Sequence, residues 1–224
     1  MPERRVFVDA VLFDLDGVLV DSVAVAEAAW RAWAARHGLD ASAVLHHIHG
    51  TRPIETIRTW LPDADAAAEA DWLVAYELNR LDACTPVAGA IELVGSLPKG
   101  RWGVVTSADR SLAQARLALL RPHEPAVLVS SSDVARGKPE PDPYSRAASV
   151  MGLADHRWLG IEDSNSGLQS VRGAGGMPCG LMSTYGREHL PDAGLLLESL
   201  LDVRVGPGSR DGEVELRLAG PPAS

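Results

Sequence analysis

The sequence predicts an α/β fold in which a doubly wound parallel sheet is interrupted by an all-helical insert. Two observations indicate the sheet: short apolar runs recur along the chain, and helical patterns separate most of them. Such alternation is typical of parallel strands covered by helices on both faces. A third observation indicates the insert, because the stretch from about Asp21 to Val87 shows helical patterns only.

The expected core elements follow from these runs. Strands are predicted at 11–13, 103–105, 126–129, 158–161 and 178–182, and helices at 111–120, 144–151 and 167–173. Near the C-terminus the segment VELRL alternates apolar and charged residues, which predicts a late edge strand followed by a loose terminus.

Within the insert, Ser22 is expected to cap a first helix that ends at His37-Gly38, where glycine provides the stop signal. A further helix is expected over 66–83, and Thr85-Pro86 marks the return to the sheet. We therefore expect a core domain formed by residues 1–20 and 88–224 and a helical cap domain formed by residues 21–87.

Charge and composition exclude several classes of protein. The 224-residue chain has a formal net charge of −9, which argues against nonspecific binding to nucleic acid or to anionic membranes. Its two cysteines do not make a disulfide framework, and we expect reduced thiols. The N-terminus has no signal-peptide pattern, and no uncharged apolar run of about 18 residues exists. A cytoplasmic protein is therefore expected, either a monomer or a homodimer.

The segment VLFDLDG drives a predicted buried strand directly into two carboxylates, Asp14 and Asp16. At ~4 Å and an effective dielectric constant of ~20 they would repel by about 4 kcal/mol, so another feature of the chain must compensate for this repulsion. One interpretation is a nucleophilic carboxylate with an acid/base beside it; the other is an Asx turn at Gly17. A calcium-binding loop is disfavoured because Val18, Leu19 and Val20 follow where oxygen ligands are needed.

Polar residues end two further predicted strands, and a lysine lies in a proline-rich segment between those strands in the sequence. Thr106 and Ser107 end the strand of GVVTSADR and could bind an anion or cap the next helix. Lys138 lies in GKPEPDPY, where prolines restrict the backbone and lower the cost of fixing the ammonium. Glu162 and Asp163 end the strand of WLGIEDSNSG; they suit Mg²⁺, although an isolated pair is more often a solvated loop.

Taken together, the four motifs DLDGVLVDS, TS, GKPEPDPY and EDSNSG resemble those of the haloacid dehalogenase (HAD) superfamily of phosphotransferases. The resemblance covers essentially the whole chain and implies a Rossmann-like core with a helical C1-type cap after the first motif. It implies Asp14 as nucleophile, Asp16 as acid/base, and Thr106, Ser107 and Lys138 as phosphate-binding residues. Mg²⁺ would be held by Asp14, the Asp16 carbonyl, Asp163 and Glu162. Asp16 also disfavours the dehalogenases of the superfamily, which lack an aspartate there.

The segment HGTRPIETI resembles a cap motif of a subgroup that includes glycerol-3-phosphatases and 2-deoxyglucose-6-phosphatases. This implies that Arg52 reaches the substrate and that His49 supports it. The alternative is a surface arginine that pairs with Glu55 three residues on. Pro53 is expected at the first position of the next helix.

The predicted activity is Mg²⁺-dependent hydrolysis of a small phosphorylated sugar or polyol through an aspartyl phosphate. The nearest alternative is a sugar phosphomutase resembling β-phosphoglucomutase, which shares the motifs and the cap. A signalling receiver also carries an aspartyl phosphate, but such proteins are shorter and lack the insert. A noncatalytic binding protein is disfavoured because every expected catalytic residue type is present.

Overall fold

The computed structural model describes residues 4–48, 52–153, 156–184, 186–210 and 212–219. Its main sheet has the order β6-β5-β2-β7-β8-β9, and every neighbouring pair is parallel. The strands are β2 (Ala10–Phe13), β5 (Trp102–Val105), β6 (Leu128–Val129), β7 (Trp158–Glu162), β8 (Met177–Leu181) and β9 (Leu195–Leu197). This arrangement confirms the predicted α/β fold.

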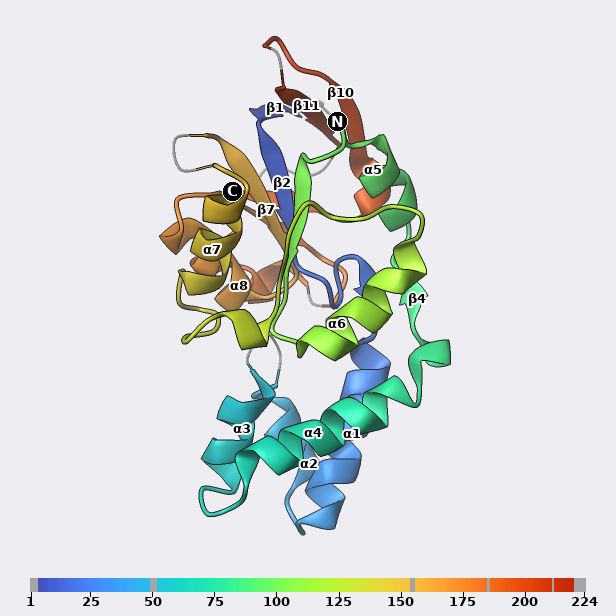
Figure 1. Ribbon diagram of the computed structural model, residues 1–224, viewed down its shortest axis with the longest axis vertical. Coiled ribbons are helices and arrows are strands. Elements are labelled where there is room, and N and C mark those ends of the chain that lie inside the picture. Colours follow the sequence, from blue (N-terminus) through green and yellow to red (C-terminus); the bar gives the residue numbers. More distant parts are fainter. Residues whose placement is uncertain (1–3, 49–51, 154–155, 185, 211, 220–224) are drawn as a thin grey trace.

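Helices cover both faces of this sheet (Figure 1), which explains why its strands read as continuous apolar runs. They are α5 (Ala90–Ser96), α6 (Arg110–Leu117), α7 (Asp142–Val150) and α8 (Asn165–Gly173). On β2, Val11 and Phe13 belong to the apolar cluster that contains residues of α5 and α6. Ala10 and Leu12 belong to the cluster on the other face, with residues of α7 and α8.

The four α-helices described between residues 21 and 85 form a separate group beside the sheet (Figure 1). They are α1 (Val23–Arg36), α2 (Ala41–Leu45), α3 (Pro53–Trp60) and α4 (Ala66–Leu78). Trp33, Ile57 and Leu73 are buried in an apolar cluster of their own. The chain enters and leaves this insert through two short antiparallel strands, β3 (Val20–Asp21) and β4 (Thr85–Pro86). We propose the domain boundary at this two-stranded ribbon.

Local signals set several helix ends, and two expectations were wrong. Gly38 follows α1 with a φ of 67°, and α3 begins at Pro53, as expected. Ser22 makes no side-chain cap bond to α1, because its Oγ donates to the Asp16 carboxylate instead. Helix α4 ends at Leu78 rather than at residue 83, since the backbone leaves the helical region at Arg80 (φ −132°).

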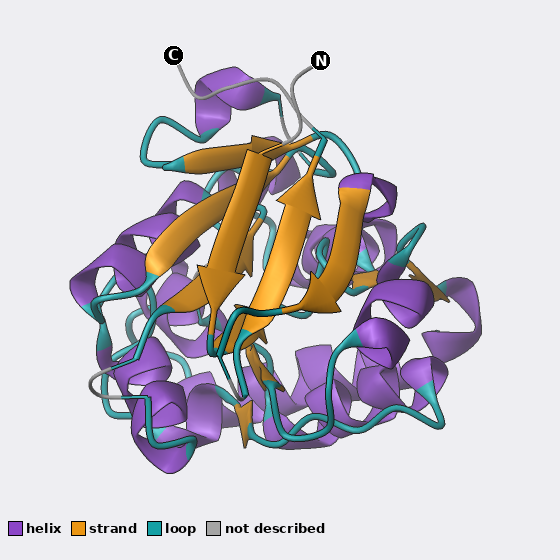
Figure 2. Ribbon diagram, turned by 90° about the horizontal axis from the view of Figure 1, so that it is seen from above, coloured by secondary structure: helices purple, strands orange, loops and turns teal. Residues whose placement is uncertain are grey.

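A second, antiparallel sheet was not foreseen (Figure 2). It has the order β1-β11-β10, with β1 (Arg4–Val8), β10 (Val203–Pro207) and β11 (Val214–Leu218). The VELRL segment forms β11, but it is the central strand and not an edge. The alternation of apolar and charged residues correctly predicted a strand. It could not predict the neighbouring strands, because β1 comes from the opposite end of the described chain.

Short 3₁₀ turns complete the described structure: η1 (Leu81–Ala83), η2 (Ala118–Leu120), η3 (Ser131–Asp133), η4 (Arg187–His189) and η5 (Leu200–Asp202). Among the described helices, none combines the length and the apolar character that a membrane span requires.

The central position of β11 predicts a large cost for truncating Leu216, which is fully buried. Leu216→Ala should lower the free energy of unfolding by about 2–5 kcal/mol, because it leaves a cavity in the apolar cluster that packs on this sheet. The control Leu201→Ala, at a side chain that is 52% exposed, should change it by less than about 0.5 kcal/mol. Urea unfolding of both variants measures this, and equal effects would contradict the placement of β11.

Candidate active site

The first acid pair lies in a tight loop that follows β2. The Asp14 amide donates to the carbonyl of Ile161 at 2.9 Å, which continues the pairing with β7. The chain then turns at Gly17, whose φ of 78° favours glycine. A Cβ there would also overlap the side chains of Asp163 and Thr184. The turn therefore brings the acids of two strands to the same edge of the sheet.

Lys138 lies between two buried carboxylates. Its Nζ is 2.5 Å from Asp14 Oδ1 and 2.6 Å from Glu162 Oε1, and it donates to the Val105 carbonyl at 3.1 Å. Burial alone would lower the pKa of this ammonium, but the carboxylates of Asp14 and Glu162 outweigh that effect and raise the pKa. The lysine is therefore a fixed positive charge at the ends of β2, β5 and β7.

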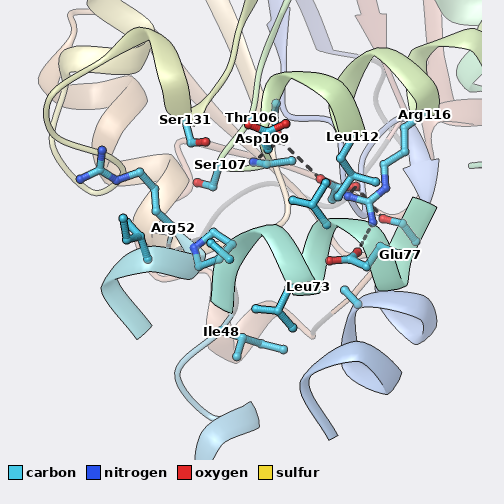
Figure 3. A pocket seen from close by; sticks show the side chains of 18 of the residues that line it. Ile48, Arg52, Leu73, Glu77, Thr106, Ser107, Asp109, Leu112, Arg116 and Ser131 are labelled. Atoms are coloured by element: carbon cyan, nitrogen blue, oxygen red, sulfur yellow. Dashed lines mark hydrogen bonds and ion pairs between the residues drawn. The ribbon is translucent and has the colours of Figure 1, made fainter. Parts of the chain in front are cut away.

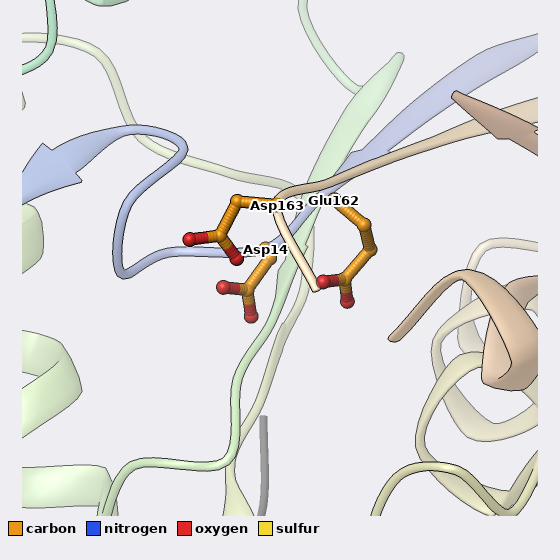
Figure 4. A group of neighbouring side chains, drawn as sticks. All are labelled: Asp14, Glu162 and Asp163. Atoms are coloured by element: carbon orange, nitrogen blue, oxygen red, sulfur yellow. The ribbon is translucent and has the colours of Figure 1, made fainter. Parts of the chain in front are cut away.

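Asp14, Glu162 and Asp163 form a compact acidic cluster (Figure 4), with one carboxylate oxygen of each lying within 4.8 Å of the others. Burial raises the pKa of Asp14 well above its usual value, and Glu162 and Asp163 raise it further against the opposing effect of Lys138. Burial and the charge of Glu162 raise the pKa of Asp163 to about 7. Three carboxylates against one ammonium leave an excess of negative charge. Hard oxygen donors with that excess suit a divalent cation such as Mg²⁺.

Side chains that the sequence analysis did not identify orient two of these acids. Tyr144 donates its hydroxyl to Glu162 Oε1 at 2.7 Å, and Ser164 donates to Oε2 at 3.2 Å. The hydroxyl of Thr184, from the segment after β8, donates to Asp163 Oδ2. Ser164 also caps α8, since its hydroxyl oxygen accepts from the amide of Gly167. Nothing in the local sequence of Thr184 indicates its partner, because the contact depends on how β8 ends.

Asp16 points to a different set of partners. Its Oδ1 accepts from Ser22 Oγ at 2.6 Å and lies 2.8 Å from Nη1 of Arg116, while its Oδ2 lies 3.4 Å from Thr106 Oγ1. Arg116 also pairs with Glu77 on α4. Both were missed, although Arg116 falls on the apolar face of α6 beside buried neighbours, where an arginine requires a partner.

A cavity of about 400 Å³ lies between the ends of the strands and helices α3 and α4 (Figure 3). Asp14, Asp16, Thr106, Ser107 and Lys138 all line it, together with Asp163. Its opposite wall comes from the helical insert and is largely apolar, with Ile48 and Leu73 labelled in the figure. The cavity is thus lined by acids and hydroxyls on the sheet side and by apolar side chains on the other.

Arg52 also lines this cavity, while its guanidinium is engaged elsewhere. It pairs with Glu55 Oε1 at 2.5 Å and donates from Nη1 to the Val134 carbonyl at 3.3 Å. The pairing expected of a surface arginine is therefore present, yet the side chain is only 15% exposed. His49 lies outside the described residues.

The sequence model of the haloacid dehalogenase-like hydrolase family matches residues 8–175. The chain belongs to this family. It is 38% identical over 199 residues to hexitol phosphatase A of Escherichia coli, and the alignment covers 87% of this chain and 92% of that protein. It is 31% identical over 210 residues to 2-deoxyglucose-6-phosphate phosphatase 2 of Saccharomyces cerevisiae, and that alignment covers 84% of this chain and 85% of the yeast protein.

Among solved structures, the β-phosphoglucomutase of Clostridium difficile superposes on this HAD-like hydrolase with a TM-score of 0.75. The match covers 86% of this chain and 92% of that one at 20% identity, which shows a shared fold. The family resemblance drawn from the four motifs is confirmed.

The raised pKa of Asp163 predicts how the stability of metal-free protein depends on pH. The folded state holds a proton up to about pH 7 that the unfolded state releases near pH 4, so stability falls as pH rises between these values. The titration of Asp163 should lower the free energy of unfolding by up to about 4 kcal/mol over this pH range. Urea unfolding in chelator at pH 5 and pH 8 measures it.

Asp163→Asn is the matched variant for this measurement, because it keeps the size of the side chain and removes its titration. Its stability should fall less between pH 5 and pH 8 than that of the wild type. Equal pH dependence of the two proteins would contradict the assigned cause.

Proposed function

We propose that this chain is a Mg²⁺-dependent phosphatase that hydrolyses a small phosphorylated sugar or polyol through an aspartyl phosphate. The observation that carries the proposal is the Asp14 carboxylate beside Lys138, at the sheet side of a cavity of about 400 Å³. Support for the substrate class comes from the relatives, which are named as phosphatases of a hexitol phosphate and of 2-deoxyglucose 6-phosphate.

In the first step, the Asp14 carboxylate attacks phosphorus and the bond from phosphorus to the ester oxygen breaks. Asp16 donates a proton to the departing oxygen, which leaves as an alcohol. Thr106, Ser107 and Lys138 hold the phosphoryl oxygens, since all three line the cavity beside Asp14. Lys138 is already placed to offset the charge that gathers on these oxygens.

In the second step, water attacks the phosphorus of the aspartyl phosphate. Asp16, now ionised, accepts a proton from that water, and the bond from phosphorus to Asp14 breaks. Inorganic phosphate leaves and both aspartates return to their starting states. One carboxyl group therefore serves as acid and then as base.

Asp14, Asp163 and Glu162 would hold Mg²⁺, together with the backbone carbonyl of Asp16. When bound, the ion offsets the charge of the phosphoryl group and of the surrounding carboxylates. The donor set fits this ion because it consists of hard oxygens with a surplus of negative charge.

The helical insert would close the reaction off from bulk water and select the leaving group. The cavity admits a small alcohol, and Arg52 lies where it could contact it. Transfer to water rather than to a sugar hydroxyl is favoured because the relatives above 30% identity are named phosphatases. The likeness to the phosphomutase concerns the fold alone.

Phosphate release from a panel of phosphorylated sugars, polyols, nucleotides and two-carbon acids tests the proposal. Release from a sugar or polyol phosphate should require Mg²⁺ and stop in chelator. Asp14→Asn should lower it by at least about 1,000-fold, because the nucleophile is lost. If the folded wild type releases phosphate from no ester, hexose 1-phosphate isomerisation becomes the next assay and hydrolysis is refuted.

The assignment of Arg52 to the substrate predicts an effect on KM. Arg52→Met should raise KM for the best sugar phosphate by about 10-fold, the value of one lost charge-assisted hydrogen bond, with a smaller change in kcat. Glu55→Gln is the control, since it weakens the pair with Arg52 and keeps the guanidinium. Steady-state kinetics of both variants measures this. An unchanged KM in Arg52→Met would show that Arg52 serves only its pairs with Glu55 and Val134.

A further inference from the structure

Asp16, the proposed acid/base, is joined to helix α4 of the insert through Arg116 and Glu77. Figure 3 labels Arg116 and Glu77 and marks the contact between them. Arg116, on α6, places Nη1 2.8 Å from Asp16 Oδ1 and bonds through Nη2 to Glu77 Oε2. The four motifs that identify the family contain neither Arg116 nor Glu77. These two residues therefore extend the site beyond its recognised parts.

Burial limits how much the ion pairs of Asp16, Arg116 and Glu77 can contribute to the stability of the fold. Arg116 is 2% exposed and Glu77 7%, so both charges are largely removed from water. Desolvation offsets much of the attraction in such a group, and two carboxylates share a single guanidinium. Burial raises the pKa of Glu77 against the lowering effect of Arg116. In addition, Nε of Arg116 is buried without a hydrogen-bond partner among the described residues. A role in placing Asp16 accounts for an arrangement that packing alone does not favour.

The contacts divide the two oxygens of Asp16 between separate tasks. Oδ1 accepts a hydrogen bond from Ser22, just before α1, and forms an ion pair with Arg116. Oδ2 lies 3.4 Å from the hydroxyl of Thr106, one of the proposed phosphate-binding residues. Fixing Oδ1 at two points orients the carboxyl plane, so that Oδ2 is the oxygen presented to the leaving group.

We propose that Arg116 and Glu77 are positioning residues that tie the orientation of Asp16 to the seating of α4 against α6. Glu77 holds the guanidinium, and the guanidinium holds Oδ1. When α4 moves away, Arg116 loses its second anchor and Asp16 loses its fixed orientation. Proton donation to the leaving oxygen is then efficient only with the insert in place over the cavity. This inference rests on the proposed phosphatase activity.

The dependence of rate on the leaving group tests this role. An alkoxide leaving group requires the proton from Asp16, whereas p-nitrophenolate leaves without it. Glu77→Gln should lower kcat/KM for the best alkyl phosphate of the panel by about 10-fold, and Arg116→Gln by about 100-fold, the scale of a misplaced catalytic group. With p-nitrophenyl phosphate, kcat/KM of both variants should fall by less than about 3-fold. We compare kcat/KM because it reports the steps up to release of the alcohol, whereas kcat also contains the hydrolysis of the aspartyl phosphate, which uses Asp16 with either ester. Arg116→Lys should recover part of the rate on the alkyl ester.

Two further variants separate positioning from general damage. In Glu77→Gln/Arg116→Gln the alkyl-ester rate should equal that of Arg116→Gln alone, because Glu77 acts through Arg116. Glu69→Gln is the matched control on α4, since Glu69 contacts Trp33 and His37 within the insert. It should leave the ratio of the two ester rates unchanged. If Arg116→Gln fails to fold by circular dichroism, Glu77→Gln and Arg116→Lys carry the test.

Equal losses on the alkyl and aryl esters, or no loss on either in Glu77→Gln, would overturn the inference. An additional loss from Glu77→Gln in the Arg116→Gln background would also overturn it. These results differ from a failure of the proposed function, in which the wild-type protein cleaves neither ester.

Discussion

The ammonium of Lys138 lies 2.5 Å from Asp14 and 2.6 Å from Glu162, in a place from which water is largely excluded. Without it, the carboxylates at the ends of β2 and β7 would repel one another where desolvation already disfavours their charge. The lysine thereby allows a chain to bury the acids that phosphoryl transfer requires. The three carboxyl groups of the cluster outnumber this single ammonium, and their oxygens are donors that suit a divalent cation.

The fold serves this cluster by bringing strand ends together. β2, β5 and β7 are adjacent and parallel, so their carboxyl ends meet at one edge, although the residues concerned are far apart in sequence. Apolar clusters on both faces pack helices against the sheet below the cavity. Gly17 then turns the chain toward the insert, which returns over the cavity through α3 and α4. Ligand sites of open parallel sheets commonly lie at this edge.

Local patterns were sufficient for much of this architecture. Apolar runs revealed five of the strands in the main sheet, and Gly38 and Pro53 marked helix ends. The chemistry of strand ends also indicated the acids, the hydroxyls and Lys138. The short strand β9 and the β1-β11-β10 sheet were missed, because their pairing joins segments that carry no mutual signal.

The parts of the site that escaped prediction are those that depend on tertiary contacts. Ser22 reads as a helix cap, yet it bonds to Asp16 because the loop returns to it. Tyr144 and Arg116 read as ordinary helical residues, and only packing shows that they meet Glu162 and Asp16. Sequence patterns thus predict the functional groups at the ends of strands. The side chains that orient these groups can be identified only from the folded structure.

The central claim is that the carboxylate held by Lys138 accepts the phosphoryl group. Rapid acid quenching during turnover, followed by borohydride reduction, converts an aspartyl phosphate into homoserine, which peptide mass spectrometry can locate. The account predicts homoserine at position 14 in protein quenched with substrate and Mg²⁺, and none without substrate. Homoserine at position 16 or 163, or phosphate release with none formed at any position, would contradict it.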